Sequence, residues 1–201
     1  MEKTLIAIPT LDTVPALFAH SLACMIRPET SRIVMLSNSL VYTARNALAA
    51  EAIQGGYKRV LWLDSDMAFR SDLMLRLNKH LDEGKDFITA LYFKRVQPTA
   101  PIIYTRRDGK YLPFTDYPEN AVFHIAGAGM GACMMTVDML EAVAQGGLPF
   151  TPESLGEDLE FCRRAIDKGY SLFCDSSIEA GHVGVAVFNE RMYKEQLKHV
   201  G

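Results

Sequence analysis

The stretch YKRVLWLDSDMAF, residues 57–69, decides how this chain folds. Its apolar run Val60–Leu63 is typical of a buried strand, and two carboxylates one residue apart, Asp64 and Asp66, follow that run directly. A buried apolar strand gains free energy by removing surface from water, whereas acids at its end lose free energy unless water, hydrogen-bond donors or a cation compensate their charge. The stretch therefore predicts a buried strand with a charged carboxyl end.

Strands and helices alternate through the first half of the chain. Apolar runs predict strands at 4–9, 32–36 and 59–63, and helical patterns are found at 13–26, 41–56 and 71–84, the last with Ser71 as N-cap. This β-α-β-α-β-α order implies a parallel sheet with helices on both faces. Ligands of such sheets bind at the carboxyl ends of the strands, so Pro9, Thr10, Ser37, Asn38 and the acid pair are expected on one rim.

The second half of the chain has a different pattern. Strands are predicted at 86–93, 100–104, 121–126 and 171–174, a Gly-rich turn at 127–136 leads into another strand, and helices are predicted at 137–145, 157–168 and 186–199. The pair Asp108 and Gly109 is typical of a hairpin turn. Antiparallel or mixed strands are thus added to the α/β pattern, and residues 1–201 are predicted to form a single domain.

Composition argues against several classes of protein. Hydrophobic residues make up 49% and charged residues 22%, as in ordinary globular domains, and the net charge of −3 gives no reason to expect a nucleic acid or an anionic membrane as partner. No apolar run reaches the roughly 18 residues of a transmembrane segment, and the first strand follows the N-terminus too closely for a signal peptide. The four cysteines form no C-x-x-C pair. We therefore expect a cytoplasmic protein.

The acid pair has two interpretations. Acids at the end of a strand often do no more than cap a turn or the next helix. Alternatively, since side chains alternate along an extended chain, Asp64 and Asp66 point the same way, with Ser65 between them, and repel each other unless a cation intervenes. Carboxylate oxygens suit Mg²⁺ or Mn²⁺, which also keep waters and bind substrate phosphates. The pattern favours a metal site.

A second acid pair and a histidine admit similar alternatives. Glu157 and Asp158 open a predicted helix, where acids commonly only complement the helix dipole. A carboxylate at that place also stays ionised, as a base that deprotonates a bound hydroxyl must. His182, next to Gly181, is predicted in a loop, where a histidine is more often a surface residue than a metal ligand.

The order of these elements resembles that of the GT-A glycosyltransferases, in particular the small family-2-like enzymes of bacteria and phages. The matching segments are TARN with VLWLDSDMAF, GAGMGACMM, GEDLEFCRRAIDKGY and GHVG, and the resemblance runs from Leu5 to about Gly184. D-x-D alone is unspecific, whereas the ordered set is more specific. The resemblance implies a GT-A fold, an α/β domain with a Rossmann-like mixed sheet flanked by helices. It further implies a nucleotide-binding half at 1–93 and an acceptor and catalytic half at 94–201.

The resemblance also implies roles for individual residues. Asp66 and His182 look like metal ligands for Mn²⁺ or Mg²⁺, and Asp64 looks like a partner of the metal or of the donor's ribose. Asp158 looks like the catalytic base, with Glu157 beside it. The residues that fall where such enzymes bind the nucleotide sugar are Pro9, Thr10, Arg45, Asp64, Ser65 and, in the Gly-rich turn, Gly129.

The implied function is metal-dependent transfer of a sugar from a nucleotide-diphosphate sugar to an acceptor hydroxyl, with inversion at the anomeric carbon. Many relatives have an acid after the second strand, where this chain has Ser37, Asn38 and Ser39. This difference leaves the nucleotide base open: a UDP-sugar is the first expectation, and a GDP-sugar or another donor remains possible. The acceptor, a glycan, lipid or protein, is not indicated. Lys94, Arg95, Arg106 and Arg107 are assigned to solvated loops in preference to contacts with phosphates.

Three alternatives were compared with this interpretation, and one of them, the phosphatase, does not fit the sequence. A nucleotidyltransferase would share the sheet and the acids, but IPTLDTVPA lacks the Gly-rich basic loop that such enzymes usually have after the first strand. A haloacid-dehalogenase-type phosphatase has its D-x-D at the first strand, unlike this chain. An inert sugar-nucleotide-binding protein would keep Asp66 and have no need of Asp158, so turnover distinguishes it from an enzyme.

Overall fold

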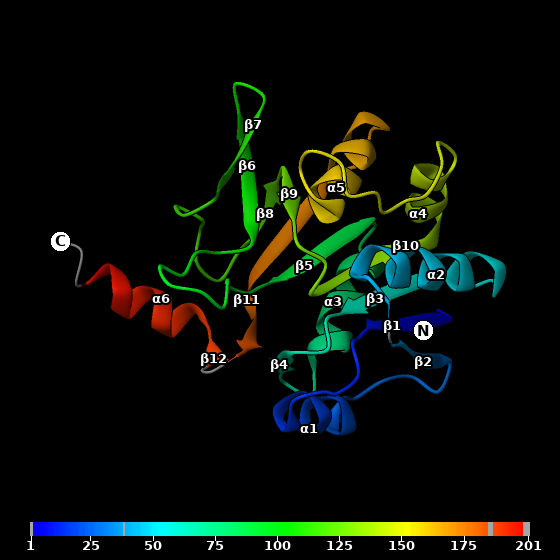
Figure 1. Ribbon diagram of the computed structural model, residues 1–201, viewed down its shortest axis with the longest axis horizontal. Coiled ribbons are helices and arrows are strands. Elements are labelled where there is room, and N and C mark those ends of the chain that lie inside the picture. The colour runs from blue at the N-terminus through cyan, green and yellow to red at the C-terminus, as the bar shows by residue number, and fades with distance from the viewer. Residues whose placement is uncertain (1, 38, 185–186, 199–201) are drawn as a thin grey trace.

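The structure, a computed structural model, describes residues 2–37, 39–184 and 187–198. A mixed sheet runs through its centre in the order β12-β11-β5-β10-β3-β1-β2, with β4 and β8 paired to β11 (Figure 1). Its strands are β1 (Thr4–Pro9), β2 (Ser31–Leu36), β3 (Arg59–Leu63), β4 (Met67–Phe69), β5 (Phe87–Leu91), β8 (Val122–Ile125), β10 (Ala132–Thr136), β11 (Leu172–Val183) and β12 (Val187–Phe188). A smaller sheet contains β6 (Ile103–Arg107), β7 (Lys110–Pro113) and β9 (Gly127–Ala128).

The order of the strands explains how the two halves of the sequence fit together. β1 pairs in parallel with β2 and β3, as the first half predicts. β10, from the second half, lies antiparallel between β3 and β5, and β11 returns to a parallel pairing with β5. The prediction of a mixed α/β sheet is therefore confirmed. Parallel strands end at the same edge, so the carboxyl ends of β1 and β3 lie side by side.

Helices cover both faces of the sheet (Figure 1). Helices α2 (Val41–Gln54), α4 (Val137–Ala144) and α5 (Glu157–Asp167) pack on one face, and α1 (Ala16–Cys24) and α3 (Leu73–Asp82) pack on the other. The alternation of side chains along each strand supplies both cores. In β3, Trp62 packs into the first core, edge-on to Phe150 with 5.1 Å between ring centroids, while Leu61 and Leu63 pack into the second. Helix α6 (Glu190–Leu197) follows β12, and its Tyr193 packs on Phe93.

Several predicted boundaries are wrong for identifiable reasons. Helix α1 begins at Ala16 and not at residue 13, because Pro15 is extended at the N-cap and disfavours helix in the residue before it. Helix α3 begins at Leu73, so its N-cap is Asp72 and not Ser71. The turn at Asp108 and Gly109 is confirmed, with φ of 49° and 76° at these two residues.

The strand predicted at 171–174 is part of a much longer one. β11 continues to Val183 because β4 and β12 pair with its second part, beyond an irregularity between Asp175 and Glu179. β4, only three residues long, was not predicted. In the predicted helix 186–199, residues 186 and 199 lie outside the described residues, as does Asn38. Among the described residues, none of the helices combines the length and the apolar character that crossing a membrane requires.

Candidate functional site

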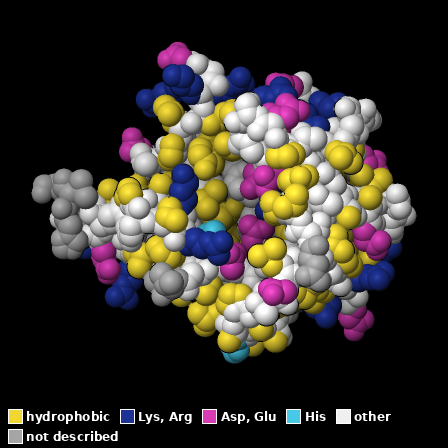
Figure 2. All heavy atoms as spheres, in the orientation of Figure 1, with side chains coloured by type: hydrophobic (Ala, Val, Ile, Leu, Met, Phe, Trp, Pro, Cys, Tyr) yellow, Lys and Arg dark blue, Asp and Glu magenta, His cyan; other side chains and the backbone are white. Residues whose placement is uncertain are grey.

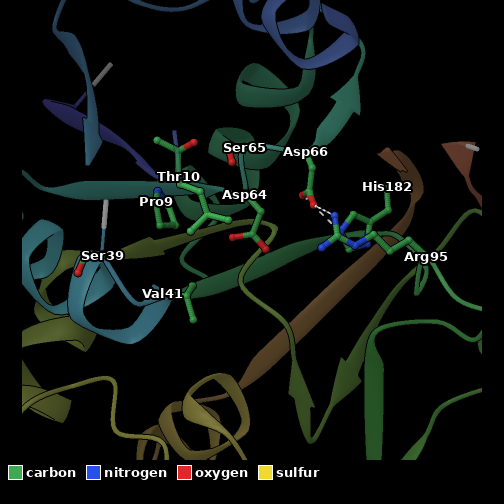
Figure 3. A pocket seen from close by; sticks show the side chains of 10 residues that line it. Pro9, Thr10, Ser39, Val41, Asp64, Ser65, Asp66, Arg95 and His182 are labelled. Atoms are coloured by element: carbon green, nitrogen blue, oxygen red, sulfur yellow. Dashed lines mark hydrogen bonds and ion pairs between the residues drawn. The ribbon is translucent and has the colours of Figure 1, made fainter. Parts of the chain in front are cut away.

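A pocket with a volume of about 290 Å³ opens at the carboxyl ends of β1 and β3. Figure 2 shows acidic side chains gathered in a hollow near the centre of this face, beside basic side chains and a histidine. The lining residues are Pro9, Thr10, Leu11, Ser39, Val41, Asp64, Ser65, Asp66, Arg95 and His182 (Figure 3). The structure thus brings six of the predicted site residues together, from three separate segments of the chain. The hydroxyl oxygen of Thr10 is buried there and has no hydrogen-bond partner among the described residues.

The two acids of the D-x-D segment point in different directions, contrary to the prediction. The chain turns after β3, with a hydrogen bond of 3.2 Å from the Met67 amide to the Asp64 carbonyl oxygen, so residues 64–66 are not extended. Asp64 accepts a hydrogen bond of 2.8 Å from Arg45 Nη2, whereas Asp66 contacts Arg95 and His182. In Figure 3 the Asp66 carboxylate points toward these two residues and that of Asp64 points away from them. Each acid therefore has its own positive partner.

His182 lies in a strand and not in the predicted loop. The GHVG segment resembles a loop because of its glycines, but Gly181 pairs with Ala68 of β4 and His182 pairs with both β4 and β12. The tight pairing also explains the glycine, since a Cβ on Gly181 would lie 2.6 Å from Val187 Cγ1. The site histidine is thereby fixed to the central sheet.

The orientation of His182 is determined by its backbone contact. Its Nδ1 lies 3.1 Å from the carbonyl oxygen of Phe93, which can only accept, so Nδ1 carries the proton. The Nε2 lone pair of the neutral ring then faces Asp66 Oδ1 at 3.3 Å. That oxygen is buried and has no hydrogen-bond partner of acceptable geometry among the described residues. Two acceptor atoms thus face each other, which is unfavourable unless a proton or a cation lies between them.

The pKa values of the pair respond to this contact. Burial raises the pKa of Asp66, but the contacts with His182 and Arg95 outweigh burial, so the pKa lies below its ordinary value. Burial lowers the pKa of His182, and its contact with Asp66 outweighs that effect and raises the pKa overall. The contact between the two side chains thus lowers the pKa of Asp66 and raises that of His182.

The same atoms suit a divalent cation. Octahedral Mg²⁺ holds its ligands at about 2.1 Å, so neighbouring ligands lie about 3 Å apart, close to the separation of 3.3 Å between His182 Nε2 and Asp66 Oδ1. A histidine that binds a metal usually donates its other ring N–H to a carbonyl or carboxylate, as His182 does. Among the described residues, no three His, Cys, Asp or Glu side chains come together in a way that could hold a metal ion. An ion held by only these two groups would keep positions for phosphate oxygens and water.

Arg45, on α2, connects the acid of the pocket with the second acid pair. Its side chain is only 2% exposed, and its guanidinium contacts Asp64 at 2.8 Å, Glu157 at 3.3 Å and Asp158. Burial lowers the pKa of Arg45, but the neighbouring carboxylates of Asp64 and Glu157 raise it overall, so the group is charged. Arg45 does not line the pocket. The sequence assigned it to the nucleotide, whereas the geometry places it between carboxylates.

Asp158 lines a second, smaller pocket of about 160 Å³. Its Oδ1 contacts Arg45 and its Oδ2 accepts a hydrogen bond of 3.2 Å from the Met130 amide. Its lining residues are Ile102, Tyr104, Ala128, Gly129, Leu155, Gly156, Glu157, Asp158 and Leu159. Gly129, which the sequence assigned to the donor site, lies here instead. The two pockets therefore present different acids, Asp66 in the first and Asp158 in the second.

Some residues of the site were not found from the sequence. Tyr92 is buried beneath it, accepts a hydrogen bond of 2.9 Å from the Gly131 amide, and has a pKa that burial raises well above its ordinary value. An aromatic residue in a predicted strand normally indicates core, so no signal marked it. Leu11 and Val41 line the first pocket with apolar side chains, which the sequence did not single out. Arg95 was assigned to a solvated loop, but it contacts Asp66.

Comparisons with known proteins define the fold and leave the chemistry open. No family model matches the sequence, and no curated protein matches it. Protein A197 from STIV has a similar structure, with a TM-score of 0.71 and 19% identity over 90% of this chain and 86% of that one. GalNAc-T7, solved with UDP, GalNAc and Mn²⁺, superposes with a TM-score of 0.63 and 11% identity over 91% of this chain. The chain spans 44% of the GalNAc-T7 chain. The predicted GT-A-like fold is thereby confirmed.

Proposed function

We propose that this protein is a glycosyltransferase that uses Mn²⁺ or Mg²⁺ to move a sugar from a nucleotide-diphosphate sugar to an acceptor hydroxyl. The observation that carries the proposal is the position of Asp66 Oδ1 and His182 Nε2, which lie 3.3 Å apart and can both bind one ion. The pair lies in the pocket at the carboxyl ends of the strands, where α/β sheets bind ligands. The GT-A-like fold, and the UDP and Mn²⁺ in the GalNAc-T7 structure, support the same assignment.

The first pocket binds the donor in this proposal. Asp66 and His182 would hold the divalent ion, which would supply positive charge against the diphosphate leaving group. The free Thr10 hydroxyl offers the nucleotide a hydrogen bond, and Pro9 and Ser65 line its path. Asp64 contacts the ribose or a water of the ion with the oxygen that Arg45 leaves free. Leu11 and Val41 supply apolar contacts for the flat base.

The second pocket binds the acceptor. Asp158 lines it and takes the proton of the attacking hydroxyl, while the Met130 amide and Arg45 hold its carboxylate in position. Glu157 shares the Arg45 guanidinium and keeps that positive charge in place. Since the base and the donor occupy separate pockets, attack from the face opposite the diphosphate is favoured, which inverts the anomeric carbon. The bound sugar acquires oxocarbenium character in the transition state.

UDP is the nucleotide that we favour for the donor, and GDP is the alternative. Residues 37–40, after β2, include no acid, and of those that the structure describes Ser39 lines the first pocket. A hydroxyl can donate to or accept from either base, so it does not select one of them by itself. The acceptor is a glycan, a lipid or a protein that presents a hydroxyl to the second pocket.

Calorimetric titration tests the donor site. UDP and GDP are each titrated with Mn²⁺ and with EDTA, against the wild-type protein, Asp66→Ala and the control Asp116→Ala, which removes an exposed acid outside both pockets. We expect one nucleotide to bind only with Mn²⁺, and Asp66→Ala alone to abolish that binding. If neither nucleotide binds the wild-type protein under any condition, the proposal is overturned. If the bound nucleotide sugar is never turned over with a panel of acceptors, the protein is an inert binding protein instead.

A further inference from the structure

Arg95 contacts the same carboxylate that the proposed cation would use. Its Nη1 lies against Asp66 Oδ2, while His182 faces the other oxygen, Oδ1. The Arg95 side chain is 52% exposed, so only part of its surface is held by the protein. Figure 3 shows its guanidinium directed at the Asp66 carboxylate, and Arg95 itself belongs to the loop after β5. A positive group of the protein therefore occupies the neighbourhood of the cation.

Arg95 also lies where two pockets meet. A further pocket of about 320 Å³ shares with the first one the residues Leu11, Ser65, Asp66 and Arg95. The ion pair between Arg95 and Asp66 thus borders both spaces. A ligand that extends from one pocket into the other passes directly beside this guanidinium.

The backbone that carries Arg95 is anchored, so that only its side chain is free to move. The Lys94 amide donates to the Ala100 carbonyl at 2.9 Å, and the Thr99 hydroxyl donates to the Lys94 carbonyl at 2.5 Å, which closes the loop on itself. The side chain of Gln196, on α6, accepts a hydrogen bond of 2.8 Å from the Thr99 amide and donates one of 3.3 Å to the Thr99 carbonyl oxygen. The residues between these anchors, from 95 to 98, are exposed. Rotation of one long side chain needs no rearrangement of this loop.

We propose that Arg95 is a positioning residue that exchanges partners: it pairs with Asp66 when the site has no donor, and with the donor diphosphate when a divalent cation occupies Asp66. The cation and the guanidinium are both positive and compete for one carboxylate, so the ion displaces Arg95. The diphosphate then supplies the nearest negative charge, and the planar guanidinium can form two parallel hydrogen bonds with phosphate oxygens. The second partner rests on the proposed function, whereas the competition for Asp66 does not.

Two binding measurements on Arg95→Ala test the exchange, because they are expected to change in opposite directions. Without Arg95 as a competitor, Asp66 should bind Mn²⁺ about threefold more tightly when no nucleotide is present, which is the scale expected for an exposed ion pair. The relaxation of water protons measures this affinity. With saturating Mn²⁺, the affinity for the nucleoside diphosphate should fall about tenfold or more, because charge-assisted bonds to phosphate are lost. Arg95→Lys, which keeps the charge without the fork, should lie between the two proteins in both measurements.

Arg107→Ala is the matched control, since it removes an exposed arginine on the β6–β7 hairpin, outside both shared pockets. It should leave both affinities unchanged. The exchange is overturned if Arg95→Ala leaves both affinities as they are, or weakens both, while the wild-type protein binds Mn²⁺ and the nucleotide. If the wild-type protein binds Mn²⁺ but no nucleotide, the proposed function is overturned. The Mn²⁺ affinity of Arg95→Ala then tests only whether Arg95 and the ion compete for Asp66.

Discussion

Arg45 and Asp158 are in direct contact, although one lies in α2 and the other at the start of α5. The same guanidinium holds Asp64 at 2.8 Å through its other terminal nitrogen. A single buried cation therefore fixes the separation between an acid of the first pocket and the acid of the second. In the proposed reaction, the positions of donor and base relative to each other depend on this one side chain.

Arg45→Met should destabilise the fold strongly. The substitution keeps most of the side-chain volume but leaves three partly buried carboxylates without their cation, and breaking one member of a buried charge cluster typically costs about 3–5 kcal/mol. Unfolding in urea measures this loss. Arg32→Met, which removes an exposed arginine paired at 3.7 Å with Glu51, should change stability by less than about 1 kcal/mol. Equal effects of the two substitutions would contradict the central role of Arg45.

Asp158→Asn should separate catalysis from donor binding. The amide keeps the shape of the side chain and cannot take a proton, so kcat should fall about 10²- to 10⁴-fold. Since Asp158 does not line the first pocket, the Mn²⁺-dependent affinity for the nucleotide should stay within about threefold of wild type. Steady-state kinetics and calorimetry on the same preparation check both values. Asp167→Asn, at the other end of α5, is the control. If Asp158→Asn kept the full kcat of wild type, Asp158 would be ruled out as the base.

The parts of the fold with strong local patterns were predictable from the sequence. β1 and β3 are apolar after their first residues, Thr4 and Arg59, and their predicted bounds agree with the structure, as does the start of α5 at Glu157. Where long-range pairing decides the structure, the local pattern was insufficient. β4 and the second part of β11 form because they pair with each other, and Gly181 and His182 resemble a loop when read alone. The pairing of strands far apart in the sequence leaves little trace in either segment.

The site shows the same division. The pocket residues at the ends of β1 and β3 follow from the rule that parallel strands end at one edge, which is why Thr10 and Asp66 were predicted on one rim. The partners of the acids did not follow from it. An arginine in the middle of a helix gives no sign that it is buried between carboxylates, and a loop arginine gives no sign that it reaches Asp66, since both contacts depend on tertiary packing.

Gly129→Ala should disturb both the packing and the base. A Cβ at this position would lie 2.5 Å from the Tyr92 hydroxyl, which burial and a hydrogen bond fix, and 2.8 Å from Cγ2 of the partly buried Ile102. Overpacking of this kind costs about 1–3 kcal/mol, and the shift it forces is next to Asp158 Oδ2, at 3.5 Å. The free energy of unfolding, measured in urea, and kcat should both fall. Gly146→Ala, with nothing within 4 Å of its added Cβ, should leave both unchanged or slightly raise stability.

Glu179 gives the protein a pH dependence away from the proposed site. This exposed residue of β11 shares a hydrogen bond with Glu190, the first residue of α6, and that bond raises the pKa of Glu179 to about 7. Burial raises the pKa of Glu190, but hydrogen bonds from Glu179 and Tyr117 and the charge of Lys194 outweigh it and lower the pKa overall. Glu179 therefore keeps a proton near neutral pH and donates it to an ionised Glu190.

The sign of the effect follows from the direction of the shift. The folded-state pKa of Glu179 lies above its ordinary value of 4.5, so its contribution to stability is complete below about pH 4.5 and is lost as the pH rises through about 7. Glu179→Gln keeps a hydrogen-bond donor at every pH. The gain in free energy of unfolding of this variant over wild type should therefore be larger at pH 8 than at pH 5.5. Because solvent screens this exposed group, the gain should be about 0.5–1 kcal/mol in urea unfolding. Glu195→Gln, an exposed control on α6 paired with Arg191, should show no such change. The prediction is wrong if the free energy of unfolding of Glu179→Gln differs from that of wild type by the same amount at both pH values. Glu179 would then be ionised at both, and it would share no proton with Glu190.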